Sequence, residues 1–219
     1  DTSPKFIEFY KPEYNSIREV LSGLGYSYSD VTHVILTHLH FDHCGGSILD
    51  GEPAFPSATY IMTRLQYING IYPNPKEKGS YIKDTFEPLV RTGRCMLVDG
   101  GSFLPDFFPG VDFFIFDGHS DGMISPLVKA GNKLIFYPSD LMPSSYHLNP
   151  HYHMSYDVRP LLLINDKQAI LKRATEEKWV ICFEHDPQNP AIVPGYDGKK
   201  YYTAEVFGER ISESVVRLV

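Results

Sequence analysis

The sequence predicts an α+β fold in which two β-sheets pack face to face with helices on their outer faces, a four-layer αβ/βα sandwich. Short apolar runs of strand length recur along the chain, helical patterns lie between them, and several of the runs end directly at polar residues. The chain has 219 residues and no shift in composition. We therefore expect residues 1–219 to form a single domain with a substantial core.

The first half of the chain contains one predicted helix and several predicted strands. A helical pattern opens at Pro12 and stops at Gly23 and Gly25. A β-branched apolar run follows, in which we expect His33 to be a packed core residue. The predicted strands of the whole chain cover residues 31–36, 58–62, 96–98, 113–116, 134–137 and 179–183.

The second half contains two predicted hairpins and one long helix. Residues 127–134 form a hairpin pattern around Gly131 and Asn132. Asn165 or Asp166 is expected to cap a helix that continues to about Lys178. Asp197-Gly198 predicts the turn of a final hairpin.

Residues 64–94 differ from the rest of the chain because aromatic residues are mixed with proline, glycine and charge. We interpret this stretch as an irregular helical insertion between strands. Two alternatives remain open for it: an insertion that covers an active site, or an ordinary excursion on the surface.

A dense group of polar side chains follows the strand expected at residues 31–36. Residues 37–46 read Thr-His-Leu-His-Phe-Asp-His-Cys-Gly-Gly, which contains the pattern His38-x-His40-x-Asp42-His43. Buried polar groups this close together each need a partner, and a pair of divalent cations would satisfy all of them. A chance histidine-rich surface loop is the plainer alternative. The pattern predicts a metal site on a loop held by a strand.

Three later segments repeat the arrangement of an apolar strand followed by a potential ligand. The ligand candidates are His119, Asp140 and His185. Each one taken alone is more often a turn residue or a helix cap. Together with the first group they provide five histidines and two aspartates, enough to hold two metal ions.

These motifs resemble those of the metallo-β-lactamase superfamily of metal-dependent hydrolases, and the resemblance extends over nearly the whole chain. It implies one ion held by His38, His40 and His119, and another held by Asp42, His43 and His185. Asp140 and a hydroxide would lie between the two ions. The ligands are nitrogen and oxygen atoms, which suits Zn²⁺ and leaves iron, manganese or cobalt open. We expect Asp42 and Asp140 to be catalytic, with Asp42 or a residue between 146 and 156 as the proton shuttle.

Two features depart from the family pattern. The third motif usually reads G-H-T-P-G-H, but here Met123 replaces the last histidine, so we expect an apolar edge to the pocket. Family members also have strands before the first motif, whereas this chain opens with Asp1-Thr2-Ser3. The expectation is a chain whose N-terminal strands are missing and belong to a separate or disordered piece of the same protein.

Residues 146–156 are rich in tyrosine and histidine and follow Asp140 closely. We expect them to line the substrate pocket, where a side chain could bind a carbonyl oxygen or protonate a leaving group. A second metal site at His151-x-His153 is disfavoured by Pro150 and by the lack of a nearby carboxylate. The expected pocket residues are Phe41, Met123, Tyr146, His147, His151 and His153.

The residues of the first motif are most similar to those of the lactonase and esterase branch of the superfamily. This resemblance implies a dinuclear hydrolase acting on a lactone or a carboxylic ester through a metal-bridging hydroxide. The alternatives are a glyoxalase-type thioester hydrolase and a mononuclear-iron oxidoreductase similar to persulfide dioxygenases. A β-lactamase and a flavodiiron protein fit the ligand set less well.

The charge and cysteine content limit the partners. The formal net charge is −7, without a cluster of lysine and arginine, which argues against a nucleic-acid substrate. No apolar run reaches the roughly 20 residues that span a membrane. The three cysteines lack zinc-finger spacing, and a cytoplasmic location is the simpler fit, with export left open. We expect a small-molecule substrate, and a homodimer remains an open alternative.

Overall fold

The computed structural model describes residue 8 and residues 17–207. Its smaller sheet is parallel and has the strand order β1-β4-β5. Its larger sheet has the order β12-β11-β10-β9-β8-β7-β6 and is antiparallel except where β10 pairs with β9. The strands of the smaller sheet are β1 (His33–Ile35), β4 (Thr59–Thr63) and β5 (Cys95–Val98). Those of the larger sheet are β6 (Phe103–Phe108), β7 (Val111–Phe116), β8 (Met123–Ala130), β9 (Lys133–Phe136), β10 (Val180–Cys182), β11 (Ala191–Tyr196) and β12 (Tyr201–Phe207).

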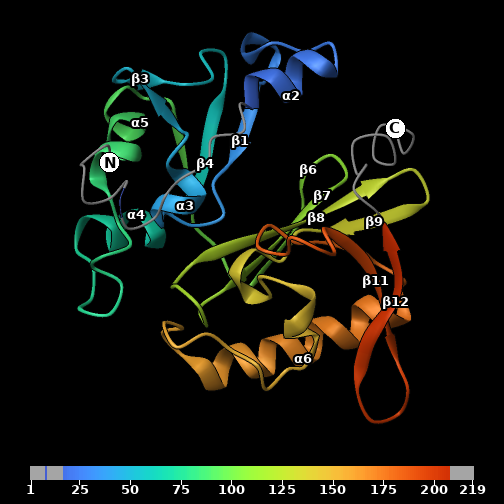
Figure 1. The fold of residues 1–219 in the computed structure, drawn as a ribbon. Helices are drawn as coiled ribbons and strands as arrows, with labels where there is room; N and C mark the ends of the chain where they lie inside the picture. Colours follow the sequence, from blue (N-terminus) through green and yellow to red (C-terminus); the bar gives the residue numbers. More distant parts are fainter. Residues whose placement is uncertain (1–7, 9–16, 208–219) are drawn as a thin grey trace.

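The helices lie outside the two sheets. Figure 1 shows α3, α4 and α5 beside the smaller sheet, and α6 along the outer face of the larger sheet. The layers therefore run helix, sheet, sheet, helix, which confirms the α+β sandwich. The described helices are α2 (Ile17–Gly23), α3 (Phe41–Cys44), α4 (Arg64–Ile71), α5 (Glu87–Arg91) and α6 (Pro160–Glu176). A short hairpin is formed by β2 (Ile48–Leu49) and β3 (Glu52–Pro53). We call the smaller sheet, helices α3 to α5 and this hairpin the smaller half of the molecule.

The core fills all three interfaces between the four layers. On β4, Tyr60 and Met62 pack with the helices of the smaller half, whereas Ile61 packs with Ile124 of the larger sheet. Successive side chains of a strand point to opposite faces, so a strand buried on both sides is apolar throughout. The third interface, between the larger sheet and α6, contains Trp179 among many apolar side chains. Both sheets are consequently held rigidly.

Most of the predicted elements are present, but two predictions are wrong. Helix α6 begins at Pro160 rather than at Asn165 or Asp166, because Pro160 suits the first helical turn and Leu163 is buried in the core. His33 is exposed, with its ring 4.7 Å from that of Phe108, so it is not a core residue. The helix predicted from Pro12 is described only from Ile17 onward, and its start lies outside the described residues.

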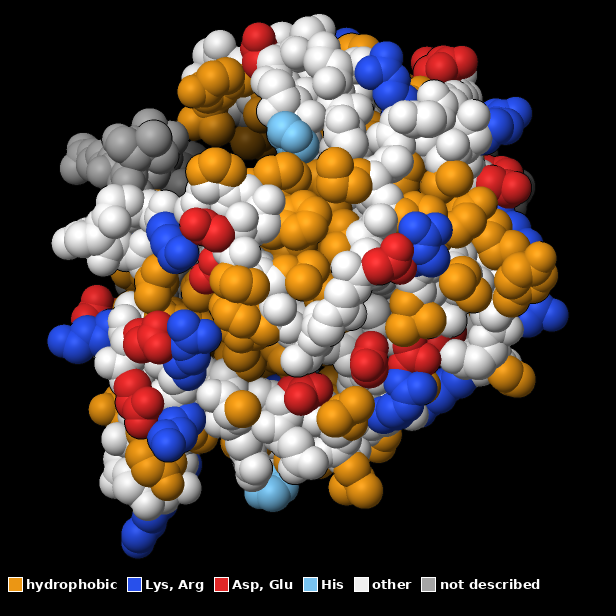
Figure 2. Space-filling model, turned by 180° about the vertical axis from the view of Figure 1, so that it is seen from behind, with side chains coloured by type: hydrophobic (Ala, Val, Ile, Leu, Met, Phe, Trp, Pro, Cys, Tyr) orange, Lys and Arg blue, Asp and Glu red, His pale blue; other side chains and the backbone are white. Residues whose placement is uncertain are grey.

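The surface carries both signs of charge. Figure 2 shows apolar side chains gathered over the middle of the face opposite to that of Figure 1, with basic and acidic side chains mixed around them. Among residue 8 and residues 17–207, no helix combines the length and the apolar character needed to cross a membrane.

Candidate metal centre

The predicted ligands lie where strands end and loops begin. His38 and His40 follow β1, and His40 caps α3, which carries Asp42 and His43. In the larger sheet, strands β7, β9 and β10 point the same way, because β8 is antiparallel to both of its neighbours and β10 is parallel to β9. Their carboxyl ends therefore lie at one edge of the sheet. The loops after these ends supply His119, Asp140 and His185.

The first group of ligands consists of His38, His40 and His119, all buried. Their ring centroids are 4.5 to 5.0 Å apart. His40 Nδ1 lies 3.2 Å from His119 Nε2. The nitrogen atoms of the three rings converge within 4.8 Å of one another, close enough for a single metal ion. The structure thus brings together the three histidines that the resemblance assigns to one ion.

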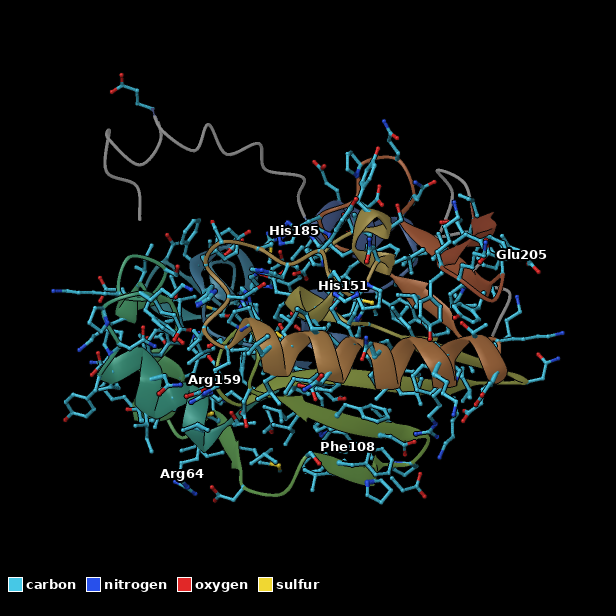
Figure 3. The ribbon with its side chains drawn as sticks, turned by 90° about the horizontal axis from the view of Figure 1, so that it is seen from below. Arg64, Phe108, His151, Arg159, His185 and Glu205 are labelled. Atoms are coloured by element: carbon cyan, nitrogen blue, oxygen red, sulfur yellow. The ribbon has the colours of Figure 1, made fainter. Side chains whose placement is uncertain are left out.

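The second group consists of His43, Asp140 and His185, together with Glu184, which the sequence analysis did not select. His43 Nε2 lies 3.5 Å from Asp140 Oδ2 and 3.5 Å from His185 Nε2. Asp42 lies at the rim of this group, with Oδ2 3.6 Å from His43 Nε2. Figure 3 shows His185 and His151 on loops that run over the same side of α6, with Arg159 at the start of that helix.

Two buried atoms of the proposed ligands support a fit to metal ions. His38 Nε2 and Asp140 Oδ1 are buried and have no hydrogen-bond partner. Leaving a buried polar atom unpaired is costly, so a fold that aims such atoms at other ligands needs something to satisfy them. A divalent cation accepts both nitrogen and carboxylate donors. The residues present therefore fit a pair of such ions.

Each imidazole of the first group has a partner for its outer nitrogen. Glu77 Oε1 lies 3.1 Å from His40 Nε2, and Asp157 Oδ1 lies 2.8 Å from His119 Nδ1. The Nδ1 atom of His38 lies 3.2 Å from the Thr37 hydroxyl. Partners of this kind hold a histidine ring in one tautomer and one orientation.

Burial and nearby charge set the protonation of the centre. Burial lowers the pKa of His38 well below its usual value, and the neighbouring histidines lower it further, so this imidazole stays neutral. For Asp140, burial favours a higher pKa, but hydrogen bonding to His43 and the neighbouring histidines hold the pKa at about 2. A neutral imidazole and an ionised carboxylate are the forms that bind metal.

The backbone before Asp140 adopts an unusual conformation. Ser139 has φ 50°, in the left-handed region that residues other than glycine rarely occupy. Its hydroxyl lies 3.0 Å from the Thr37 hydroxyl, to which it donates, and 3.3 Å from His38 Nδ1. This conformation lets one short turn join the loop of the first motif to Asp140.

The insertion at residues 64–94 reaches the centre. Phe41 N–H donates to the Ser80 carbonyl at 2.9 Å, and His40 pairs with Tyr81 across an isolated bridge. Gln66 accepts a hydrogen bond from Leu39 N–H and donates to the Ser120 hydroxyl. The insertion therefore ties the first motif to the loop of His119 instead of being only a surface excursion.

Met123 does not lie where the sequence analysis placed it. Its side chain is fully buried in the core between the larger sheet and α6. It pairs with Phe116 in the β7–β8 ladder, so it forms part of the core and not the edge of an open pocket. Cys44 is a buried thiol, as expected, and contacts Thr85 Oγ1.

The other expected pocket residues occupy varied positions. Tyr146 and His151 are exposed, and Phe41 is half-buried at the start of α3. His147 is half-buried, with Nδ1 2.9 Å from the Ser144 hydroxyl. His153 Nδ1 lies 3.7 Å from Asp157 Oδ2. A substrate role for these five residues stays a prediction.

Three residues at the centre were missed as site residues: Glu77, Asp157 and Glu184. Glu184 directly precedes His185, and its acidic side chain was a signal in the sequence. Asp157 directly follows the 146–156 cluster, so the statement that no carboxylate lies near His151-x-His153 was wrong. Glu77 lies in the insertion, and nothing in the sequence connects it to His40.

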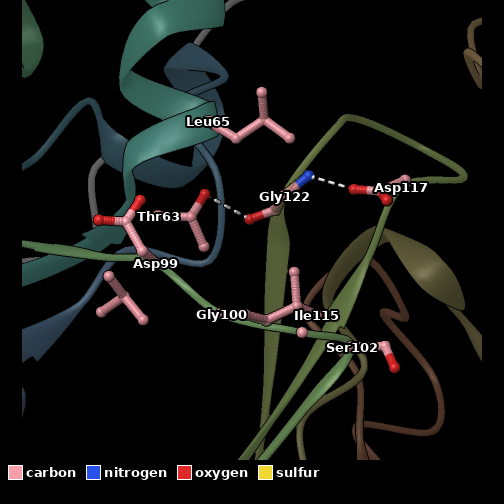
Figure 4. Close-up of a pocket in the computed structure, with 10 residues that line it drawn as sticks. Thr63, Leu65, Asp99, Gly100, Ser102, Ile115, Asp117 and Gly122 are labelled. Atoms are coloured by element: carbon pink, nitrogen blue, oxygen red, sulfur yellow. Dashed lines mark hydrogen bonds between the residues drawn. The ribbon is translucent and has the colours of Figure 1, made fainter.

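A cavity of about 290 Å³ lies between the ends of β4, β5, β7 and β8. Figure 4 shows Gly122 there, accepting a hydrogen bond from Thr63 and donating one to Asp117. None of the residues that line this cavity is one of the candidate ligands. The cavity is therefore separate from the histidine groups.

Comparison with known proteins gives a consistent picture. A family model described as the metallo-beta-lactamase superfamily matches residues 9–49, which include the first motif. An N-acyl homoserine lactonase of Bacillus thuringiensis is 24% identical over 177 residues, covering 80% of this chain and 63% of the relative. The chain thus spans less than two thirds of the length of that curated relative. The N-acyl homoserine lactonase AttM of Rhizobium radiobacter is 29% identical over 113 residues, covering 51% of this chain and 41% of the relative.

Solved structures share the fold. A probable metal-dependent hydrolase from Staphylococcus aureus superposes with a TM-score of 0.81 at 22% identity, covering 94% of this chain and 74% of its own. The dizinc quorum-quenching lactonase AidC, solved with a product, gives a TM-score of 0.70 at 19% identity, covering 87% of this chain and 70% of its own. At such identities the likeness establishes the fold.

Proposed function

The chain belongs to the metallo-β-lactamase superfamily, and from that premise we propose that it is a dinuclear metal-dependent hydrolase acting on a lactone or a carboxylic ester. One observation carries the proposal: the carboxylate of Asp140 lies between the two groups of ligands and contacts both. Asp140 Oδ2 lies 3.2 Å from His119 Nε2, and Asp140 Oδ1 lies 3.5 Å from His185 Nε2. A carboxylate placed in this way can hold two cations side by side.

Two divalent cations would supply a water molecule of lowered pKa and would polarise the carbonyl that is attacked. His38, His40 and His119 would hold one of them, and Asp42, His43 and His185 the other, with Asp140 shared. Zinc suits this set of nitrogen and oxygen donors, and iron, manganese or cobalt would also fit. Among these side chains, Asp42 and His185 are substantially exposed, and the others are not. Asp42 is therefore the carboxylate best placed to exchange a proton with solvent.

Tyr156 is a suitable donor to the substrate. Its ring lies edge-on to His119, with centroids 5.9 Å apart, and about half of the residue is exposed. Burial and the charge of Asp140 raise its pKa to about 12, so the phenol remains protonated at neutral pH. Its hydroxyl donates to Met154 Sδ at 2.8 Å. Sulfur is a weak acceptor, so the hydroxyl can turn toward a carbonyl or leaving-group oxygen at low cost.

The choice of a lactone is supported by the relatives. Those at 24% to 29% identity are N-acyl homoserine lactonases by name. A lactone is a cyclic ester, so its carbonyl needs the same polarisation as that of an open ester. Two cations beside the loops of His119 and Asp157 are already engaged and offer little to a glutathione carboxylate: Lys76 donates to the Asp157 carbonyl, and Arg159 pairs with Asp121. This arrangement favours an ester or lactone over a glutathione thioester.

The test is turnover by protein whose metal content has been measured. Purified full-length protein loaded with Zn²⁺ is given an N-acyl homoserine lactone, an aryl ester, a glutathione thioester and a persulfide. We expect two equivalents of metal per chain and the release of acid from the lactone or the ester. The Asp140→Asn variant is expected to lose most of this activity, because an amide cannot replace the shared carboxylate.

The other outcomes separate the alternatives. Cleavage of the thioester alone would favour a glyoxalase-type enzyme. One equivalent of iron, with oxygen uptake on the persulfide and no hydrolysis, would contradict the proposal and support an oxidoreductase.

A further inference from the structure

Glu184 lies between two ligands of the second group. Its Oε1 atom is 2.7 Å from His43 Nδ1 and 3.3 Å from His185 Nε2. Its Oε2 atom accepts a hydrogen bond from the Tyr137 hydroxyl. The side chain is only 18% exposed, so the carboxylate is largely withdrawn from water. Its Oε2 atom is therefore anchored by a hydrogen bond, and its Oε1 atom lies in charge contact with the two histidines.

The orientation of His43 shows what this contact does. His43 Nε2 faces the other ligands, 3.5 Å from Asp140 Oδ2 and 3.6 Å from Asp42 Oδ2. His43 Nδ1 faces away from them, toward Glu184. An imidazole binds metal through one nitrogen when the other nitrogen carries its proton. A carboxylate at Nδ1 holds the proton there and leaves the lone pair of Nε2 free.

We propose that Glu184 is a positioning residue for the second metal ion alone, holding His43 so that Nε2 faces Asp140. This inference rests on the proposed function only in that both require two metal ions. Tyr137 follows β9, three residues before Asp140, and anchors the second oxygen of Glu184. The strand ends that supply the ligands thus also supply the anchor.

The two ion sites depend on different outer partners. Glu77 contacts His40, and Asp157 contacts His119, both in the first group. Glu184 contacts His43 and His185, both in the second group. A change at Glu184 should therefore act on one ion, and a change at Glu77 on the other. This separation provides a matched control within the same chain.

The experiment is a titration of the metal-stripped full chain with Zn²⁺, in competition with a chromophoric chelator. Wild type, Glu184→Gln and Glu77→Gln are compared. We expect Glu184→Gln to weaken the second equivalent by about 10- to 100-fold and to leave the first nearly unchanged. Glu77→Gln should weaken the first equivalent instead. In a titration with Co²⁺, the absorption band of the second ion should be shifted in Glu184→Gln, and that of the first ion in Glu77→Gln.

Folding is checked by the thermal unfolding of each metal-free variant. If Glu184→Gln does not fold, Tyr137→Phe removes only the anchoring hydroxyl and should weaken the same second equivalent by a smaller factor. The inference would be overturned if Glu184→Gln bound both ions as tightly as wild type, or if its affinity for both ions fell to the same extent. Wild type that binds a single ion would overturn this inference together with the proposed function. Wild type that binds two ions but cleaves neither lactone nor ester would overturn the function only, and the variants would still decide the role of Glu184.

Discussion

Asp157 connects the candidate metal centre to the loop rich in tyrosine and histidine. Its Oδ1 atom accepts from His119 Nδ1, and its Oδ2 atom accepts from Met154 N–H at 2.6 Å. The residue is 1% exposed, so it has little access to water. A buried carboxylate with both oxygens engaged fixes the histidine and the loop together.

Replacing Asp157 by asparagine should therefore weaken metal binding. An amide that donates to His119 Nδ1 would force the proton onto Nε2, which faces the other ligands. We expect the affinity of the first ion to fall by about 10- to 100-fold, as measured by competition with a chelator. His153→Ala is the control, since His153 lies 3.7 Å from the other oxygen of Asp157 and contacts no candidate ligand. Unchanged zinc affinity in Asp157→Asn would refute this role.

Lys167 is a buried cation that secures the same loop from helix α6. Its side chain is inaccessible to water, and Nζ donates to the carbonyls of Asn149 and Tyr152. Burial lowers its pKa to about 8, from an ordinary value of 10.5. Between these two pH values the unfolded chain binds more protons than the folded chain, so folding stability should rise with pH.

This linkage predicts a pH-dependent difference between wild type and Lys167→Met. The variant should be less stable at every pH, because two carbonyls lose their donor. The unfolding free energy of wild type relative to the variant should increase as the pH rises above about 8, by up to about 1.4 kcal/mol per pH unit. Urea unfolding of both proteins at a fixed zinc concentration measures this difference in unfolding free energy. A difference that stays constant or shrinks with pH would show that Lys167 is not buried as a charged group.

At the scale of elements, α6 is seated directly on the loop that carries His119. Arg159 N–H, at the start of the helix, donates to the Gly118 carbonyl at 2.7 Å. A Cβ atom at Gly118 would lie 2.5 Å from Leu163 Cβ and 2.7 Å from its Cα. Only glycine therefore allows α6 to approach this closely, and the approach sets the position of the neighbouring His119.

Gly118→Ala should consequently affect stability and metal binding together. Because the clash involves the helix backbone, α6 must shift, at a cost of about 1–3 kcal/mol in unfolding free energy. The shift would also move His119 and weaken the first ion. The matched control is Gly101→Ala, where a Cβ would meet nothing within 4 Å, and we expect a change below about 0.5 kcal/mol. Equal stability of the two variants in denaturant titrations would contradict this account.

For the molecule as a whole, the candidate metal centre joins the two halves of the sandwich. His38 and His40 follow a strand of the smaller sheet, whereas His119, Asp140 and His185 follow strands of the larger sheet. Ions shared between these groups would cross-link the sheets. Bound ions would provide partners for the unpaired atoms His38 Nε2 and Asp140 Oδ1.

Metal removal should therefore lower the stability of the entire fold. Any ligand that binds only the folded state stabilises it by RT ln(1 + [L]/Kd), about 2.7 kcal/mol at a hundredfold excess over Kd. We expect chelation to lower the melting temperature in calorimetry, and added zinc to restore it. His119→Ala, lacking one ligand, should respond less to zinc than wild type. A melting temperature that does not change on chelation would argue against a structural contribution of the ions.

The sequence by itself determined the class of fold and pointed to the seven proposed ligands. Four of the proposed ligands lie within six residues, and the other three follow apolar strands, so local patterns were sufficient to propose them. Short apolar runs likewise predicted the strands, since such runs reflect strands that are buried in the sheets. The start of α6 was misplaced because the burial of Leu163, near the start of the helix, follows only from packing on the larger sheet.

Only the tertiary structure decided which side chains support the ligands. Glu77 lies 37 residues from His40, and Asp157 lies 38 residues from His119, with separate elements between them. Met123 was expected at the edge of the pocket, but the packing of the layers places its side chain in the core. A contact of this kind depends on how the layers pack, and a pattern along the chain carries information only about neighbours in sequence. The proposed ligands could be named from the sequence because their pattern is local, whereas their partners required the fold because each hydrogen bond joins segments that meet only after packing.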